Sequence, residues 1–229
     1  MAPRALPGSV YMAGSGEPTV LRALVARAIK DTPRPRVAVS YAAVAGSHQG
    51  LSHMQRTLGS LFAGAPGARV SRFSVAGESD AMPDAEARRI VEEADIVFLS
   101  GGDPALGAKT LDAAGASEWL RAARARGASM MGISAGSIML GAWWAEWDEQ
   151  DVGALVACSG VASDLVVDCH DEDSDWEELR QVERLLTARE GAGPIALYGI
   201  PAGGALVVDA GDAITSEGKP PFVLRARSQ

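Results

Sequence analysis

Short apolar runs of strand character alternate with segments of helical periodicity along the first part of the chain. The expected strands cover residues 9–13, 36–45, 70–75, 95–100 and 128–133. Between them, apolar residues recur at the three- and four-residue spacing of a helix, over 20–29, 51–62, 83–91 and 116–126. Strands that alternate with helices imply βαβ units and a parallel sheet covered on both faces. We therefore expect an α/β fold, a three-layer sandwich with a mostly parallel sheet.

The pattern changes after Gly141. The next expected elements are a strand over 142–147, a strand and turn over 155–169, and a long helix over 175–189. Ser174 and Glu177 have the S-x-x-E spacing of a capping box, which predicts the start of this helix. Three strands, expected to be partly antiparallel, close the chain over 195–200, 205–209 and 222–225.

Composition limits the class of protein. A chain of 229 residues with 47% hydrophobic residues can bury about 70% of its unfolded surface without a disulfide or metal. We expect one domain over residues 1–229. The formal net charge of −8 disfavours phosphate backbones, so no nucleic-acid partner is expected.

Two cysteines, Cys158 and Cys169, are too few for a disulfide framework, and a reducing compartment is expected. Apolar runs stay shorter than the ~18 residues of a membrane span. The first residues lack the sustained apolar segment of a signal peptide. We expect a cytoplasmic protein with no membrane partner.

The strongest candidate for chemistry is Gly132-Ile133-Ser134-Ala135-Gly136, which fits G-x-S-x-G. An apolar strand precedes it and a helix follows, which is the setting of a nucleophile elbow. Such a turn exposes the Ser134 hydroxyl at the carboxyl end of the sheet, where open α/β sheets bind ligands. The N–H of Ala135 would face the same point and help to hold an oxyanion. The alternative is a tight turn with an ordinary capping serine.

A catalytic serine needs a base, and the chain has three histidines. His48 and His53 flank the start of an early helix, where we expect surface residues. His170 ends an apolar strand in Asp168-Cys169-His170 and is the best-placed base for Ser134. The alternative is a solvated histidine in an acidic loop. A metal site is disfavoured because no second histidine lies nearby.

A carboxylate that orients the imidazole would complete a triad. Glu146 is the first candidate, because it lies in the Trp-rich segment 143–147, where a bare charge is unusual. Other acids lie at the end of that segment or beside the histidine: Asp148, Glu149, Asp151 and Asp168.

Ser100-Gly101-Gly102-Asp103 ends the neighbouring expected strand. Two glycines allow close approach of the backbone, and the N–H of Gly102 is a candidate second oxyanion donor. A plain turn between strand and helix explains the same residues equally well.

These three segments together resemble peptidase family S51, which holds dipeptidase E (aspartyl dipeptidase) and cyanophycinase. The resemblance extends over about residues 8–210 as a pattern of elements. It implies a flavodoxin-like sheet, similar in fold to the class I glutamine amidotransferases, which carry cysteine at the elbow. It also implies a serine hydrolase that cuts small peptides next to an aspartyl residue through an acyl-enzyme, with no cofactor or metal.

The resemblance implies a role for each matching residue. Ser134 would be the nucleophile, His170 the base, and the N–H groups of Gly102 and Ala135 the oxyanion hole. The family's acid would fall within 146–149, where Glu146 is our choice. The short interval between Ser134 and His170 is closer to the dipeptidase E branch than to cyanophycinase.

Residues 171–175 are acidic, where cyanophycinases carry arginines. This departure disfavours cyanophycin as the substrate. A carboxylate substrate needs a cation nearby, and Arg180 and Arg184 remain for this task. We expect Asp103 and Arg180 to contact the substrate. The alternative for both arginines is ion pairing with Glu177 and Glu183 on the same helix.

Two other functions stay open at this point. An α/β-hydrolase esterase shares G-x-S-x-G but places its acid and histidine later in the chain. A catalytically silent, amidotransferase-like binding module fits the acidic run after His170, because fold does not fix function. The expected partner is a small peptide substrate. The oligomeric state is left open, with a homodimer as one expectation.

Overall fold

The structure, a computed structural model, describes residues 6–32, 38–42, 56–65, 67–75, 81–147, 153–189 and 195–226. The predictions made for five polar residues lie outside these ranges: His48, His53, Asp148, Glu149 and Asp151.

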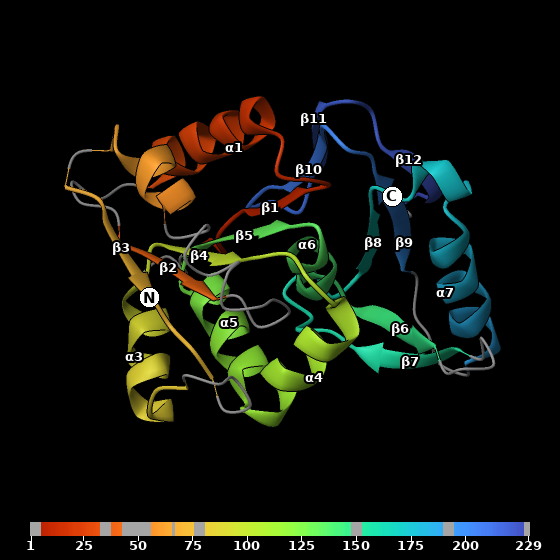
Figure 1. Ribbon diagram of the computed structural model, residues 1–229, viewed down its shortest axis with the longest axis horizontal. Helices are drawn as coiled ribbons and strands as arrows, with labels where there is room; N and C mark the ends of the chain where they lie inside the picture. The colour runs from red at the N-terminus through yellow and green to blue at the C-terminus, as the bar shows by residue number, and fades with distance from the viewer. Residues whose placement is uncertain are drawn as a thin grey trace.

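The central sheet has seven strands in the order β11-β10-β1-β5-β4-β2-β3 (Figure 1). The five parallel strands are β1 (Val10–Ala13), β5 (Ser129–Ile133), β4 (Ile96–Leu99), β2 (Ala38–Ala42) and β3 (Arg69–Arg72). The antiparallel edge consists of β10 (Gly204–Val208) and β11 (Ile214–Gly218). Because β1, β4 and β5 are parallel neighbours, the loops that follow them lie together at one end of the sheet.

Helices cover both faces of this sheet (Figure 1). On one face, α1 (Pro18–Asp31) and the helical residues 56–62 pack on Tyr11, Phe98 and Met131. The opposite face, with Met12, Leu99 and Met130, is covered by α3 (Asp84–Glu93), α4 (Pro104–Ala113) and α5 (Ala116–Ala125). Alternate residues of β1, β4 and β5 thus enter two separate cores, as pleated strands require. The expected three-layer α/β fold with a mostly parallel sheet is confirmed.

Two smaller sheets lie beside the central one (Figure 1). One has the order β12 (Phe222–Arg225), β9 (Ala196–Ile200), β8 (Leu165–Cys169), and β8 runs parallel to β9. The other pairs β6 (Trp143–Trp147) with β7 (Gly153–Ala157). Helix α7 (Glu177–Ala188) packs against both of them.

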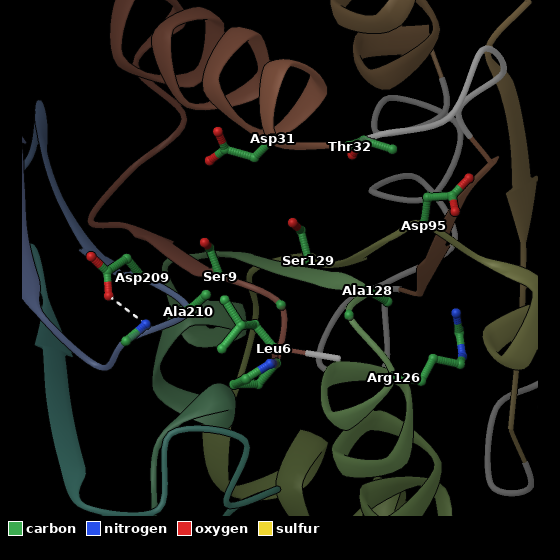
Figure 2. Close-up of a pocket in the computed structure, with 14 residues that line it drawn as sticks. Leu6, Ser9, Asp31, Thr32, Asp95, Arg126, Ala128, Ser129, Asp209 and Ala210 are labelled. Atoms are coloured by element: carbon green, nitrogen blue, oxygen red, sulfur yellow. Dashed lines mark hydrogen bonds between the residues drawn. The ribbon is translucent and has the colours of Figure 1, made fainter. Parts of the chain in front are cut away.

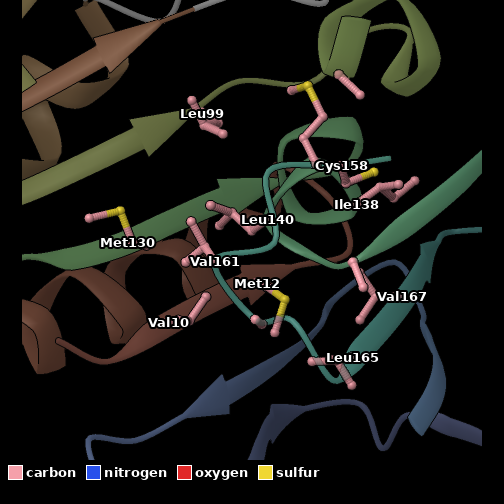
Figure 3. Packing of buried hydrophobic residues seen from close by; sticks show 14 of the residues in the cluster. Val10, Met12, Leu99, Met130, Ile138, Leu140, Cys158, Val161, Leu165 and Val167 are labelled. Atoms are coloured by element: carbon pink, nitrogen blue, oxygen red, sulfur yellow. The ribbon is translucent and has the colours of Figure 1, made fainter. Parts of the chain in front are cut away.

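A continuous hydrophobic core joins the central sheet to β8. Helix α6 (Ala135–Leu140) is buried throughout and lies between them. Met12 and Met130 of the central sheet, Ile138 of α6 and Val167 of β8 belong to the same cluster (Figure 3). This packing fixes the carboxyl end of β8 relative to the carboxyl end of β5.

Three details differ from the sequence predictions. Helix α4 was not predicted, because small residues such as Gly107 and Ala108 form its buried face and leave no apolar stripe. Strand β11 was not predicted, because it is a largely polar edge strand, ITSEG. The capping box is wrong: α7 begins after Trp176, which has a left-handed backbone, and the Ser174 hydroxyl binds Asp171 instead.

The two glycines of G-x-S-x-G are required by close backbone packing. A Cβ atom at Gly132 would lie 2.5 Å from the carbonyl carbon of Gly136. One at Gly136 would lie 2.1 Å from the carbonyl oxygen of Leu99. The glycines therefore let α6 start directly against β4 and β5.

We expect Gly136→Ala to lower the free energy of unfolding by about 3 kcal/mol, because the added methyl group would overlap backbone that cannot move aside. Gly59→Ala is the matched control: Gly59 is helical, and a Cβ there would meet nothing within 4 Å. That variant should be neutral or gain up to about 1 kcal/mol. Urea unfolding of both variants measures the difference. Equal stabilities would contradict this account of the turn.

Candidate active site

Ser134 lies on a strained turn between β5 and α6. Its backbone has φ 52° and ψ −124°, a conformation that costs a non-glycine residue on the order of 1–3 kcal/mol. Its N–H donates to the carbonyl of Ala13 at 2.9 Å, and its own carbonyl accepts from Ser137 N at 2.8 Å. These bonds hold the turn in place, so the serine side chain leaves the sheet at its carboxyl end.

His170 follows β8 and also has a left-handed backbone, with φ 50°. Its N–H donates to the carbonyl of Ile200, the last residue of β9, at 2.9 Å. Its Nε2 atom lies 2.8 Å from the Ser134 Oγ atom. The two residues that the sequence analysis paired as nucleophile and base are therefore in hydrogen-bonding contact.

The loop after β4 passes next to the serine. A Cβ atom at Gly101 would lie 3.2 Å from the Ser134 Cβ and 3.6 Å from its Oγ. Gly102 follows with φ 145°. Ala135 is the first residue of α6, and a first-turn N–H has no acceptor within its own helix. The N–H groups expected to form an oxyanion hole thus belong to segments that meet at Ser134.

Asp103 and Arg180, expected at the substrate, have partners within the protein. Asp103 is the N-cap of α4, where its carboxylate accepts from Leu106 N at 3.0 Å. Arg180 donates to both the carbonyl and the carboxylate of Asp175, at 3.0 and 3.2 Å, and lies over the Phe222 ring. Neither contact requires a substrate, so both binding roles stay predictions.

Arg184 and Glu183 of α7, for which the sequence left ion pairing open, are also paired within the protein. Arg184 binds Glu177 at 2.6 Å, one of the pairings left open by the sequence. Glu183 pairs with Arg225 on β12 and not with an arginine of its own helix.

Glu146 lies on β6 with its carboxylate against the Lys109 ammonium of α4. The glutamate side chain is 52% exposed. The sequence analysis expects this carboxylate to be enclosed in the aromatic strand with a histidine as its partner. In the structure Glu146 is exposed and pairs with Lys109, although strand alternation places it on the same side of β6 as the buried Trp144. Within the described ranges, no hydrogen bond joins Glu146 to His170.

Two further carboxylates belong to the segments on either side of His170. Asp168 is 2% exposed; its Oδ1 accepts from Cys169 N at 2.7 Å, and its Oδ2 has no hydrogen-bond partner in the described part of the chain. Burial, assisted by Asp171 and Glu178, raises the pKa of Asp168 to about 8.

Glu178, in the first turn of α7, is within electrostatic range of His170, which sequence reasoning missed. Burial and the charge of Asp171 raise the pKa of Glu178, and the nearby His170 lowers it. The sequence separation of Glu178 and His170 does not predict this interaction, because it depends on the path of the turn between β8 and α7, which the sequence did not reveal.

A separate cavity of about 540 Å³ lies at the other end of the central sheet (Figure 2). Its lining includes Ser9 and Ser129, which stand at the amino ends of β1 and β5, with Asp31 and Asp209. Ser134 and His170 are absent from this lining, so the cavity is distinct from the serine–histidine site.

Within the described ranges, no three His, Cys, Asp or Glu side chains gather in a way that could hold a metal ion. None of the helices described here combines the length and apolar character needed to cross a bilayer.

Comparison with known proteins identifies the family. The model of peptidase family S51 matches residues 20–215. The chain belongs to this family, and its class of activity is that of a peptidase. No curated protein matches the chain.

Two solved structures share its fold. One is a peptidase from an acI-B1 Actinobacterium, with 20% identity, TM-score 0.73, and coverage of 96% of this chain and 91% of that chain. The other is a putative peptidase E protein from Listeria monocytogenes EGD-e, with 15% identity, TM-score 0.63, and coverage of 93% and 100%.

The raised pKa of Asp168 predicts a pH-dependent stability. Between about pH 4 and 8 the unfolded carboxyl has lost its proton while the folded one keeps it, so the free energy of unfolding should fall as pH rises. The slope is at most about 1.4 kcal/mol per pH unit. Asp168→Asn should flatten this slope, whereas the exposed Asp173→Asn should leave it unchanged. Urea unfolding from pH 5 to 8 measures the pH slope of the unfolding free energy. Equal slopes for the wild type and both variants would refute the assignment of this pH dependence to Asp168.

Glu146→Gln and Lys109→Met test the third catalytic position together. Amide substitution of an acid that orients an imidazole costs about 10⁴ in kcat, whereas an exposed ion pair contributes about 0–1 kcal/mol to stability. From the observed contact we expect both variants to keep kcat within about threefold of wild type. A large loss in Glu146→Gln alone would restore this residue as the triad acid.

Proposed function

We propose that the protein is a serine peptidase acting on small peptides, with Ser134 as nucleophile and His170 as general base. The observation that carries the proposal is the 2.8 Å contact between Ser134 Oγ and His170 Nε2 at the strained turn after β5. Catalytic nucleophiles are activated by a base at this distance. A silent binding module would have no need for such a contact, nor for a strained serine to make it.

In the first half of the reaction, Ser134 Oγ attacks the carbonyl carbon of the scissile peptide bond while His170 Nε2 takes the hydroxyl proton. The N–H groups of Ala135 and Gly102 stabilise the negative charge that forms on the carbonyl oxygen. When the C–N bond breaks, His170 returns the proton to the leaving amine. The acyl group remains as an ester of Ser134.

In the second half, a water molecule attacks the ester and His170 accepts one of its protons. The C–O bond to Ser134 breaks, the proton returns to Ser134 Oγ, and the product leaves as a carboxylic acid. Each atom of the cleaved bond is accounted for, and no step in this sequence requires a cofactor.

An aspartyl preference is the finer proposal that the family resemblance implies. It needs a cation that can face the substrate carboxylate. Arg180 would have to exchange its contacts with Asp175 for the substrate, and Arg184 its contact with Glu177. Hydrolysis of dipeptides that differ only in the residue before the scissile bond tests this preference.

Ser134→Ala should lower kcat on the order of 10⁶-fold, and His170→Ala nearly as much, because nucleophile and base act as one unit. A fluorophosphonate probe should label wild type at Ser134 and neither variant. Ser216→Ala, an exposed serine on β11, is the matched control and should be labelled and active like wild type. The proposed function would be refuted if the wild-type protein were neither labelled nor active as a peptidase. It would also be refuted if Ser134→Ala turned substrate over at the wild-type rate.

A further inference from the structure

The cavity at the amino ends of β1 and β5 lies outside the serine–histidine site. It has a volume of about 540 Å³ and is lined by these strand ends and by the end of α1 (Figure 2). Met130 N–H donates to the carbonyl of Ser9 at 2.9 Å, so Ser9 and Ser129 stand side by side on paired strands. Tyr11 and Met131, two residues further along, face α1, and alternation places both serines on that same face.

The Ser129 hydroxyl points into this cavity without a protein partner. Ser129 is 5% exposed, and its Oγ atom makes no hydrogen bond within the described part of the chain. Figure 2 shows the hydroxyl directed away from β5, towards the end of α1. A polar group enclosed in this way is costly unless something in the cavity bonds to it. The hydroxyl therefore marks the cavity as a place for a ligand that forms hydrogen bonds.

Asp31, the last residue of α1, gives the cavity a fixed negative charge. Its Oδ2 accepts from the Tyr11 hydroxyl at 2.8 Å, and Tyr11 is fully buried. Burial, followed by the contact with Asp31, raises the pKa of Tyr11, so the phenol keeps its proton and the charge of the pair stays on the carboxylate. The Oδ1 of Asp31 has no hydrogen-bond partner among the residues that the structure describes, and it remains for a ligand.

A second carboxylate comes from Asp209, which directly follows β10. Its Oδ1 accepts from the N–H groups of Gly211 and Ala213, at 2.8 and 3.0 Å, and these bonds hold the side chain in place. Its Oδ2 has no hydrogen-bond partner in the described ranges. Two carboxylates are thus fixed at separate points of the cavity wall (Figure 2).

Two arginines near these carboxylates are held by other partners. Arg126, which also lines the cavity, donates from Nη2 to two backbone carbonyls at the end of α3, at 2.9 Å each. Figure 2 shows it on the side of the cavity away from Asp209. Arg27, one turn before Asp31, pairs with Glu217 on β11 at 3.5 Å. The wall beside the two serines is therefore negatively charged.

The acids of the lining are spread apart and do not converge on one point. Asp31, Asp95 and Asp209 stand on different sides of the cavity in Figure 2. They do not form one of the three-residue acidic groups that could hold a metal ion, none of which occurs in the part of the chain described. The lining also includes the methyl groups of Ala128 and Ala210. Separated carboxylates with apolar wall fit a ligand whose charges are separated by an alkyl chain.

We propose that this cavity binds a small organic diamine, a molecule with two protonated amino groups joined by an alkyl chain. Asp31 would hold one ammonium group and Asp209 the other, while the Ser129 hydroxyl accepts a further N–H. Charge-assisted hydrogen bonds to the carboxylates supply the affinity. The site lies at the opposite end of the central sheet from Ser134, so it goes beyond the proposed peptidase function and does not depend on it.

The test is isothermal titration calorimetry of the full-length protein with 1,3-diaminopropane, 1,4-diaminobutane and 1,5-diaminopentane. The best of them should bind with a Kd below about 1 mM, and butylamine, with one charge, about tenfold more weakly. The uncharged 1,4-butanediol should not bind, and the affinity of the diamine should fall as salt rises from about 0.05 to 0.5 M. Absence of diamine binding, equal affinity for butylamine, or binding of calcium chloride in place of the diamine would overturn the proposal.

Asp31→Asn and Asp209→Asn each remove one charge and keep an oxygen that can accept the existing hydrogen bonds. Each should weaken diamine binding about tenfold, and Ser129→Ala about threefold. Asp173→Asn, at an exposed acid outside the cavity, is the matched control and should bind like wild type. Thermal unfolding verifies that each variant is folded.

Wild-type affinity in either variant of Asp31 or Asp209 would contradict the proposed site. Binding is measured without turnover, so a failure here leaves the roles proposed for Ser134 and His170 untouched, and an inactive enzyme leaves the diamine site untouched.

Discussion

The carbonyl oxygen of Ala13 holds the serine–histidine end of the molecule together. It accepts the Ser134 N–H at 2.9 Å and the Ser137 hydroxyl at 2.8 Å, and the Cys169 thiol approaches it at 3.9 Å. These donors come from the elbow, from the first turn of α6 and from the residue before His170. One backbone group at the end of β1 therefore connects both segments that carry the serine and the histidine.

Burial makes this connection rigid. Ser137 is fully buried, and Cys169 is 4% exposed. Water cannot compete for these donors, so each bond is stronger than it would be at the surface. Residues of β5, α6 and β8, Cys169 among them, belong to one hydrophobic cluster (Figure 3). The short distance between Ser134 Oγ and His170 Nε2 follows from this packing and needs no bound ligand.

Sequence reasoning predicted those features that depend on local pattern. The strand before Ser134, the glycines beside it and the strand before His170 each have a signal within a few residues, and the structure brings their ends together. Helix α4 and strand β11 lack such a signal, because one buries small residues and the other is an exposed edge. The surroundings of Glu146 and Glu178 depend on how distant elements pack, so the Lys109 contact and the electrostatic interaction of Glu178 with His170 could not be derived from spacing.

The left-handed backbone of Ser134 and His170 has a consequence for how this protein responds to selection. Both residues occupy conformations that glycine adopts without cost and other residues adopt only under strain. Replacement by glycine at either position would release that strain and remove a group of the serine–histidine pair. If Ser134 and His170 have the proposed catalytic roles, laboratory evolution for heat resistance alone would therefore favour inactive sequences at these two positions, and a screen that couples survival to turnover would be needed to retain activity.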